Sequence, residues 1–255
     1  MPRYFLEVAY KGEAYSGFQT QKNANSVQQE IEKAFRILQR ESVSMTGSSR
    51  TDAGVHALQN FFHFDFEGAV HPQFLYKINA ILPQDIVIHS IREVAPEAHC
   101  RFDATGREYR YYIYQKKDPF LRDRAFYFPY RLDLDIMQQA AERVKSYQDF
   151  TSFSKRNTQV KSFICQITQS EWYREGDCLV YRVEANRFLR GMVRALTATM
   201  LKLGRHKITM EDFSAIIEAK DCREASFAVP PHGLFLVRVN YPPGVLEPGA
   251  KNFDY

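Results

Sequence analysis

The sequence predicts an α+β fold made of two halves, each a mixed, mostly antiparallel sheet with flanking helices. Three observations support this prediction. The length of 255 residues exceeds that of a typical single domain. Apolar residues alternate along some segments, as in strands, and recur at helical spacing along others. The pattern breaks around residues 95–96 and then starts again, so we expect an N-terminal half at residues 1–105 and a C-terminal half at residues 106–255.

The first half is predicted to follow the order β-α-β-β-α-β. Its first strand covers residues 4–10, where alternate positions are apolar. A helix begins after Ser26, because Ser26 and Gln29 have the spacing of a capping box and an apolar stripe follows over residues 27–38. The other expected elements are strands near 43–47, at 59–66 and at 86–93, and a short helix near 72–80.

The second half repeats this order with one helix added. Its closing strand is marked by the alternation of Phe235, Val237 and Val239. Such ferredoxin-like units, which also form RNA recognition modules, support many unrelated activities, so the fold alone does not predict the function. The other expected elements are strands at 107–115, 163–173 and 178–186, and helices at 134–145, 188–204 and 209–218, followed by an extended surface tail at 242–255.

The composition favours a soluble protein that could bind nucleic acid. A formal charge of +4 and an aromatic content of 14% are compatible with a basic, aromatic-rich surface, although most individual rings should belong to the core. No apolar run approaches the ~20 residues that a membrane span requires, so we expect a cytoplasmic protein. The four cysteines form no Cys-x-x-Cys pair, which argues against a zinc site and a disulfide framework.

Residues 50–56, Arg-Thr-Asp-Ala-Gly-Val-His, are predicted to form a tight polar loop between two strands. Gly54 permits backbone angles that other residues avoid, and Thr51 offers a hydroxyl group. Asp52 could either bond to its own backbone in an Asx turn or act as a catalytic carboxylate. Composition alone favours the turn.

This heptapeptide resembles the signature loop of the tRNA pseudouridine synthase A family, and similar segments cover nearly the whole chain. The resemblance implies the pseudouridine synthase fold, with two ferredoxin-like (RRM-like) halves. Two positions depart from the family pattern: Ser49 replaces a glycine and Phe18 replaces a tryptophan. The other similar segments are residues 17–19, 26–28, 79–83, 101–105, 109–111, 149–153, 188–194 and 233–237.

The resemblance implies a tRNA pseudouridine synthase, an isomerase whose catalytic residue here is Asp52. The reaction detaches uracil from ribose C1′ at N1 and rejoins it through C5, without oxidation or energy input, so we expect no cofactor and no metal. A carboxylate beside the sugar could attack C1′ or remove the C2′ proton. The family also implies a homodimer acting on the anticodon stem-loop of several tRNAs, at about positions 38 to 40.

Further site residues follow from the same resemblance. Arg194 is expected to pair with Asp52 and keep it ionised, with Arg50 as a second basic group. Tyr109 is expected to stack on the target base, whereas its pattern alone would place it in an aromatic core ladder. The residues expected to contact tRNA phosphates are Arg101, Arg107, Arg110, Lys155, Arg156, Lys161, Arg187 and Arg190.

One further pattern concerns residues 185–210, which include six lysines and arginines but no acidic residue, and this suits a surface that meets phosphates. Arg187, Arg190 and Arg194 have the spacing of one helix stripe, and such a stripe is otherwise a solvated face. The other three basic residues of this run are Lys202, Arg205 and Lys207.

Three alternatives remain open at this point. One is a metal-dependent phosphoesterase that uses Asp52, His56, His63 and Asp65 as ligands. Another is an RNA-binding protein without catalytic activity, although the aromatic motif of RNA recognition strands is absent. The third is a pseudouridine synthase that acts on a different RNA site.

Overall fold

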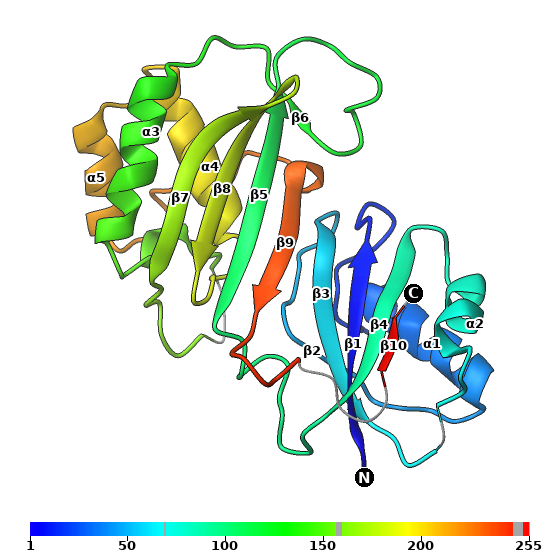
Figure 1. Ribbon diagram of the computed structural model, residues 1–255. Helices are drawn as coiled ribbons and strands as arrows, with labels where there is room; N and C mark the ends of the chain where they lie inside the picture. The colour runs from blue at the N-terminus through cyan, green and yellow to red at the C-terminus, as the bar shows by residue number, and fades with distance from the viewer. Residues whose placement is uncertain (69, 157–159, 247–251, 255) are drawn as a thin grey trace. The chain divides into compact units, whose positions relative to one another are not determined.

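The computed structural model describes residues 1–68, 70–156, 160–246 and 252–254, which form two compact units (Figure 1). Unit 1 contains residues 1–105 and 236–255, and unit 2 contains residues 106–235. Residues 236–246 and 252–254, which were expected in the C-terminal half, therefore belong to unit 1. The chain passes from unit 2 into unit 1 within strand β9 (Leu234–Asn240).

Unit 1 has the predicted order β-α-β-β-α-β. Its strands lie in the order β10-β4-β1-β3, with β1 antiparallel to both β3 and β4, and β2 pairs with β3. The elements are β1 (Arg3–Tyr10), α1 (Val27–Gln39), β2 (Thr46–Gly47), β3 (His56–Asp65), α2 (Phe74–Ile81), β4 (Ile86–Val94) and β10 (Asn252–Asp254).

The helices of unit 1 pack on its sheet through aromatic side chains. Ser26 caps α1 as expected, because its hydroxyl accepts a hydrogen bond from the Gln29 N–H at 3.2 Å. Phe35, on the apolar stripe of α1, lies edge-on to Phe64 of β3 at 5.1 Å between ring centroids and also contacts Phe74 of α2. These buried rings hold both helices against the sheet.

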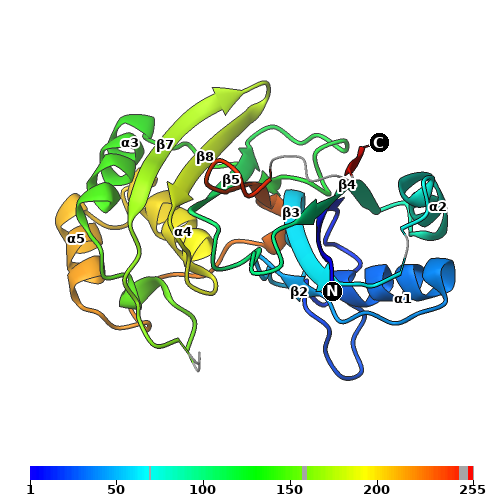
Figure 2. The ribbon, with the colours of Figure 1, turned by 60° about the horizontal axis from the view of Figure 1, so that its bottom comes forward.

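Unit 2 contains strands β5 to β8, with helices on one face of them (Figures 1 and 2). Strand β8 lies between β5 and β7 and is antiparallel to both, and β6 pairs with β5 in parallel. The elements are β5 (Gly106–Tyr114), β6 (Phe126–Tyr127), α3 (Leu134–Arg143), β7 (Ile167–Glu175), β8 (Cys178–Ala185), α4 (Met192–Gly204) and α5 (Met210–Glu218), with 3-10 turns at Val144–Ser146, Thr151–Phe153 and Pro231–Gly233.

Several boundaries differ from the predictions. The helix expected at 188–204 begins only at Met192, because Gly191 has a φ of 77° and ends the preceding loop. The strand expected at 43–47 shrinks to the two residues of β2. Two short strands, β6 and β10, were not predicted from the sequence. Strand β10 lies in the C-terminal tail that was expected to be extended, and it pairs with β4. Among the described residues, no helix has both the length and the apolar character needed to span a membrane.

Candidate active site

The Asp52 loop joins β2 to β3 in unit 1 (Figure 1). The side chains on either side of the aspartate, Thr51 and Val55, are buried, whereas Asp52 is partly exposed and Arg50 is exposed. The loop is therefore anchored in the unit by its buried residues and presents its two charged residues towards the outside.

A buried set of hydrogen bonds connects this loop to strands β1 and β3. The Tyr10 hydroxyl lies 2.8 Å from the Thr51 hydroxyl. The Asn60 side-chain amide donates to the Ser49 carbonyl at 2.8 Å and to the Tyr10 hydroxyl at 3.3 Å. Asn60 and this role of Tyr10 were not predicted, although a polar Asn60 directly before Phe61 and Phe62 is a recognisable signal.

The backbone of the loop turns sharply directly after Thr51. The Val55 N–H donates to the Asp52 carbonyl at 3.2 Å, and Gly54, with a φ of 76°, occupies the turn position that favours glycine. Gly17 also has a positive φ, and a Cβ there would lie 3.2 Å from the Thr51 carbonyl oxygen. The adjacent Phe18 N–H donates to that same carbonyl at 3.2 Å.

The two departures from the family pattern fit this structure. Ser49 has no positive φ, so a side chain is tolerated there, and its carbonyl accepts the Asn60 hydrogen bond. Phe18 is buried and stacks on Phe62 with ring centroids 4.5 Å apart. Gly47 leaves room for this ring, because a Cβ at Gly47 would lie 2.1 Å from it.

The residues proposed as alternative metal ligands have other partners. The buried His56 accepts a hydrogen bond at Nδ1 from the Gly12 N–H at 3.0 Å. Asp65 forms a bidentate pair with Arg3, at 2.7 and 2.9 Å. The Nδ1 of His63 lies 3.2 Å from the Cys100 sulfur. In the described parts of the chain, no group of three or more metal-binding side chains is placed to hold an ion.

Tyr109 lies in unit 2 on the helix-covered face of β5. It is largely buried, and its ring is perpendicular to that of Phe188, with centroids 5.1 Å apart. Tyr111 follows on the same face, where its hydroxyl donates to the Pro230 carbonyl at 2.8 Å, and burial raises its pKa. Tyr109 thus belongs to the aromatic ladder that its spacing predicts, which gives its ring a fixed orientation.

Arg194 lies in the first turn of α4, close to this ladder. Its Nε and Nη2 atoms both donate to the Val229 carbonyl, at 3.0 and 2.6 Å. The side chain is partly buried and is held by a backbone oxygen that carries no net charge. Its positive charge therefore remains available to an anionic group.

The expected stripe of Arg187, Arg190 and Arg194 on one helix is wrong. Arg187 and Arg190 lie in the loop before α4, because the helix starts after Gly191. The Arg190 carbonyl instead accepts a hydrogen bond from the Lys155 N–H at 3.0 Å. A Cβ at Gly191 would come within 3.1 Å of the Lys155 side chain, so this glycine permits the two segments to approach closely.

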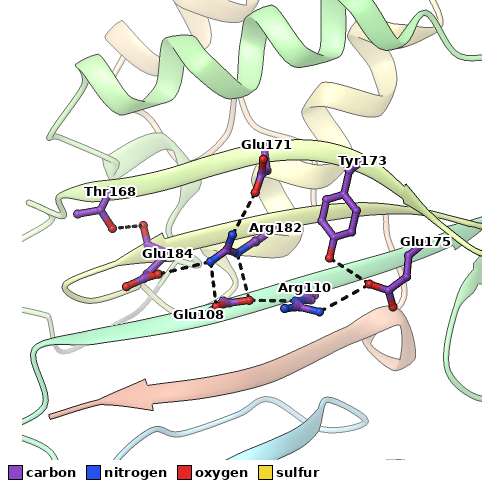
Figure 3. Close-up of polar contacts among 8 residues, drawn as sticks. All are labelled: Glu108, Arg110, Thr168, Glu171, Tyr173, Glu175, Arg182 and Glu184. Carbon is purple, nitrogen blue, oxygen red and sulfur yellow. Dashed lines mark hydrogen bonds and ion pairs between the residues drawn. The ribbon is translucent and has the colours of Figure 1, made fainter.

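Arg110 has a different environment on the opposite, helix-free face of β5 (Figure 3). Its Nε lies 2.9 Å from the carboxylate of Glu108, whose side chain is 3% exposed, and Arg182 of β8 pairs with the same carboxylate at 3.2 Å. Although burial lowers the pKa of Arg110, its hydrogen bond to Glu108 contributes to a net increase. Arg110 is therefore part of an ion-pair network on this face of the sheet.

The remaining residues expected to contact tRNA are distributed over both units. Arg101 is exposed in unit 1. In unit 2, Arg107 donates to the Asn186 carbonyl at 2.9 Å, and Arg156 and Lys161 are exposed on either side of residues 157–159.

Comparisons with known proteins reveal a close similarity to one family. A family model described as tRNA pseudouridine synthase matches residues 7–103 and 140–242. A tRNA pseudouridine synthase A from Parabacteroides distasonis is 47% identical over 95% of this chain and 97% of its own length. The corresponding protein of Bacteroides thetaiotaomicron is 43% identical over 98% and 95%, and that of an Exiguobacterium species is 40% identical over 94% and 98%.

Proposed function

This chain belongs to the tRNA pseudouridine synthase family and is a uridine-to-pseudouridine isomerase, and we propose that Asp52 is its catalytic residue. The structure of the loop at residues 50–56 carries this proposal. Thr51 is held through its hydroxyl by Tyr10 and through its carbonyl by the Phe18 N–H. The Asp52 carbonyl accepts a hydrogen bond from the Val55 N–H, while the Asp52 side chain is partly exposed at the turn. A carboxylate on such a rigid loop can be positioned accurately against a ribose.

The isomerisation needs a carboxylate but no oxidant. The C1′–N1 bond breaks, the base turns, and C5 forms the new bond to C1′, after which C5 loses a proton and N1 gains one. Asp52 can attack C1′ to form an ester that C5 then displaces. Alternatively, it can take the C2′ proton to give a glycal, and return that proton when C5 adds. In both routes Asp52 must be ionised.

Unit 2 supplies the other two groups of the proposal. Arg194 provides the cation that keeps Asp52 ionised, and its anchoring to Val229 supports this role because the guanidinium is already oriented before substrate binds. Tyr109 stacks on the target uracil, which must leave the helical stack before its glycosidic bond is accessible. Arg50 adds a second positive charge beside the loop of Asp52.

The proposed substrate is the anticodon stem-loop of several tRNAs, at about positions 38 to 40, bound by a cytoplasmic homodimer that grips the tRNA with both subunits. The names of the relatives support tRNA as the substrate class. The candidate phosphate contacts at Arg101, Arg107, Arg110, Lys155, Arg156, Lys161, Arg187 and Arg190 belong to the same proposal.

The decisive experiment incubates the protein with unmodified tRNA transcripts in the presence of a chelator and without nucleotide, and maps pseudouridine by position. Asp52→Asn should abolish product while leaving tRNA binding intact. Asp177→Asn, in the exposed turn between β7 and β8, removes the same charge and should retain full activity.

Each outcome distinguishes between the alternatives. Product formation by Asp52→Asn would exclude the catalytic assignment. Loss of activity in chelator would favour the metal-dependent alternative. If the unsubstituted protein bound tRNA without forming product, the non-catalytic alternative would stand, and product outside the anticodon stem-loop would change only the proposed site.

A further inference from the structure

Several basic residues at and just after the C-terminal end of α4 have no anionic partner among the residues that the structure describes. Lys202, Arg205 and Lys207 come from the run without acidic residues, but none of them belongs to the proposed active site. Within the described residues, their side chains form no hydrogen bond or ion pair. In contrast, Arg110 and Arg182, elsewhere in the same unit, form ion pairs with glutamates (Figure 3).

Arg205 is nevertheless held in a defined position. Its guanidinium carbon lies 3.7 Å from the ring centroid of Tyr130 and 5.9 Å from that of Phe128. A guanidinium stacked on a ring uses its face for packing and keeps its N–H donors in the plane, directed outward. Arg205 is thus oriented by the rings, with its hydrogen-bonding capacity unused.

The rings that orient Arg205 are fixed as well. The Phe128 N–H donates to the Tyr114 carbonyl at 2.9 Å, and the Gln115 side chain donates to the Tyr130 carbonyl at 2.5 Å. Phe128 and Tyr130 contact each other edge-on, with centroids 4.9 Å apart. Tyr130 is still 46% exposed. Exposing an apolar ring to water is unfavourable, so this ring is accessible for contact with a ligand.

The preceding loop adds to the positive charge of this region. Residues 115–131 contain five basic residues and only two acidic ones, Asp118 and Asp123. Asp118 accepts a hydrogen bond from the Phe120 N–H at 2.7 Å and so shapes the loop itself. Asp133, the nearest acidic residue along the chain beyond this loop, caps α3 and lies 3.3 Å from His206.

We propose that this basic–aromatic surface, made of Phe128, Tyr130, Lys202, Arg205 and Lys207, binds the sugar–phosphate backbone of the substrate tRNA together with one unstacked base. Arginine and lysine side chains without partners suit phosphates, and an exposed tyrosine suits a nucleobase. This inference rests on the proposed function, because the RNA is its substrate.

The surface is separate from the proposed catalytic groups. Arg205 follows Arg194 by eleven residues along α4, which corresponds to roughly 16 Å at the helical rise. The nucleotides that contact this surface therefore lie several nucleotides away from the reacting uridine. Substitutions in the surface should change tRNA binding and KM but leave kcat unchanged.

The test compares the triple variant Lys202→Gln/Arg205→Gln/Lys207→Gln with the unsubstituted full-length protein. We expect tRNA affinity to fall, and KM to rise, by about tenfold or more at physiological salt, with an unchanged kcat. The slope of log affinity against log salt should become shallower by about 1 to 3. Tyr130→Ala and Arg205→Lys should each weaken binding by at least about threefold, because each removes the stacked arrangement.

Lys145→Gln is the matched control. It removes one positive charge from unit 2 at a lysine that is already paired with Glu142 at 2.6 Å. This variant should bind tRNA normally, and circular dichroism should show that all variants are folded. Normal affinity and an unchanged salt slope in the triple variant would overturn the proposal. It would also be overturned if the triple variant lost binding only because a dimer had dissociated, as light scattering would reveal.

The failure of this inference can be distinguished from the failure of the proposed function. If the unsubstituted protein forms no pseudouridine but the triple variant binds tRNA more weakly, the surface is supported and the function is not. If the unsubstituted protein forms pseudouridine and the triple variant binds tRNA normally, the function stands without the surface.

Discussion

At the scale of single residues, Asn60 is a buried contact of the Asp52 loop. Its buried amide bonds both Ser49 in the loop and Tyr10 in β1, so one side chain ties the loop to the sheet. We expect Asn60→Ala to lower kcat for pseudouridine formation by about tenfold or more, because small displacements of a catalytic group are costly. The free energy of unfolding should fall by about 1–3 kcal/mol, since polar partners are left unsatisfied.

Asn79→Ala is the control for this prediction. Asn79 also makes two hydrogen bonds through its side chain, both to the backbone of Ile88, but it lies on α2. Asn79→Ala should lower the free energy of unfolding by a similar amount, as measured by denaturant unfolding, without a change in kcat. A normal kcat for Asn60→Ala would mean that the loop does not depend on this amide.

His63 should make the stability of unit 1 dependent on pH. Burial lowers its pKa to about 4, with a further contribution from the neighbouring His99 and Arg3, whereas an unfolded histidine has a pKa near 6.5. The unfolded chain therefore binds more protons between these values, and stability must fall as the pH decreases from about 6.5 to 4. The loss from this residue should reach about 3 kcal/mol at most.

Chemical denaturation at several pH values between 4 and 7 measures this effect. His63→Gln should flatten the dependence, because it removes the titrating ring. His89→Gln, at an exposed position on β4, should retain it. An equally steep dependence in His63→Gln would assign the effect to another group.

At the scale of elements, Glu108 connects β5 to β8 through two arginines on the helix-free face (Figure 3). Glu108→Ala would leave Arg110 and Arg182 partly buried without their shared carboxylate. We expect the free energy of unfolding to decrease by about 3–5 kcal/mol, as for other broken buried pairs. Denaturant titrations would measure the change.

Glu171→Ala provides the comparison on the same sheet. Glu171 also contacts Arg182, at 3.2 Å, but its side chain is 41% exposed. Its removal should cost less than about 1 kcal/mol, because water screens an exposed pair. Equal losses from the two substitutions would show that burial does not determine the strength of this network.

The predictability of the elements follows from how local their signals are. The start of α1 was predicted because Ser26 and the apolar stripe after it act within one helix. The start of α4 was not, because Phe188 and Arg190 are compatible with a helix and only the positive φ of Gly191 separates them from it. Strands β6 and β10 are too short for a periodic pattern, and pairing with β5 and β4 defines them.

At the scale of the whole molecule, the residues proposed for catalysis and base binding belong to different units. Arg50 and Asp52 come from unit 1, and Tyr109 and Arg194 from unit 2. Composition and spacing alone favoured a turn at Asp52 and a core ladder at Tyr109, and only the family resemblance assigned them roles. The bracing of the loop by Asn60 was not predicted, because it depends on two strands and a loop that meet only in the folded unit.

The proposed homodimer leads to a prediction about mixed subunits. If one tRNA contacts both subunits, Asp52 of one chain can act on RNA held by the basic–aromatic surface of the other. An Asp52→Asn chain and the triple variant at Lys202, Arg205 and Lys207 would each be impaired alone. Co-expressed with different tags and purified as a mixed dimer, they should recover a measurable part of the normal kcat/KM, because one catalytic carboxylate then faces one intact RNA surface.

The mixed dimer must be compared with an equal mixture of the two separately purified variants. Activity above that mixture would show that the two functions can lie on different chains, so the subunits cooperate on one substrate. Activity equal to the mixture would mean that each subunit binds and modifies its own tRNA. A single-chain mass by light scattering, near the 29.8 kDa of one chain, would remove the premise of the prediction. The pairing of Asp52 with the RNA surface would then have to occur within one chain.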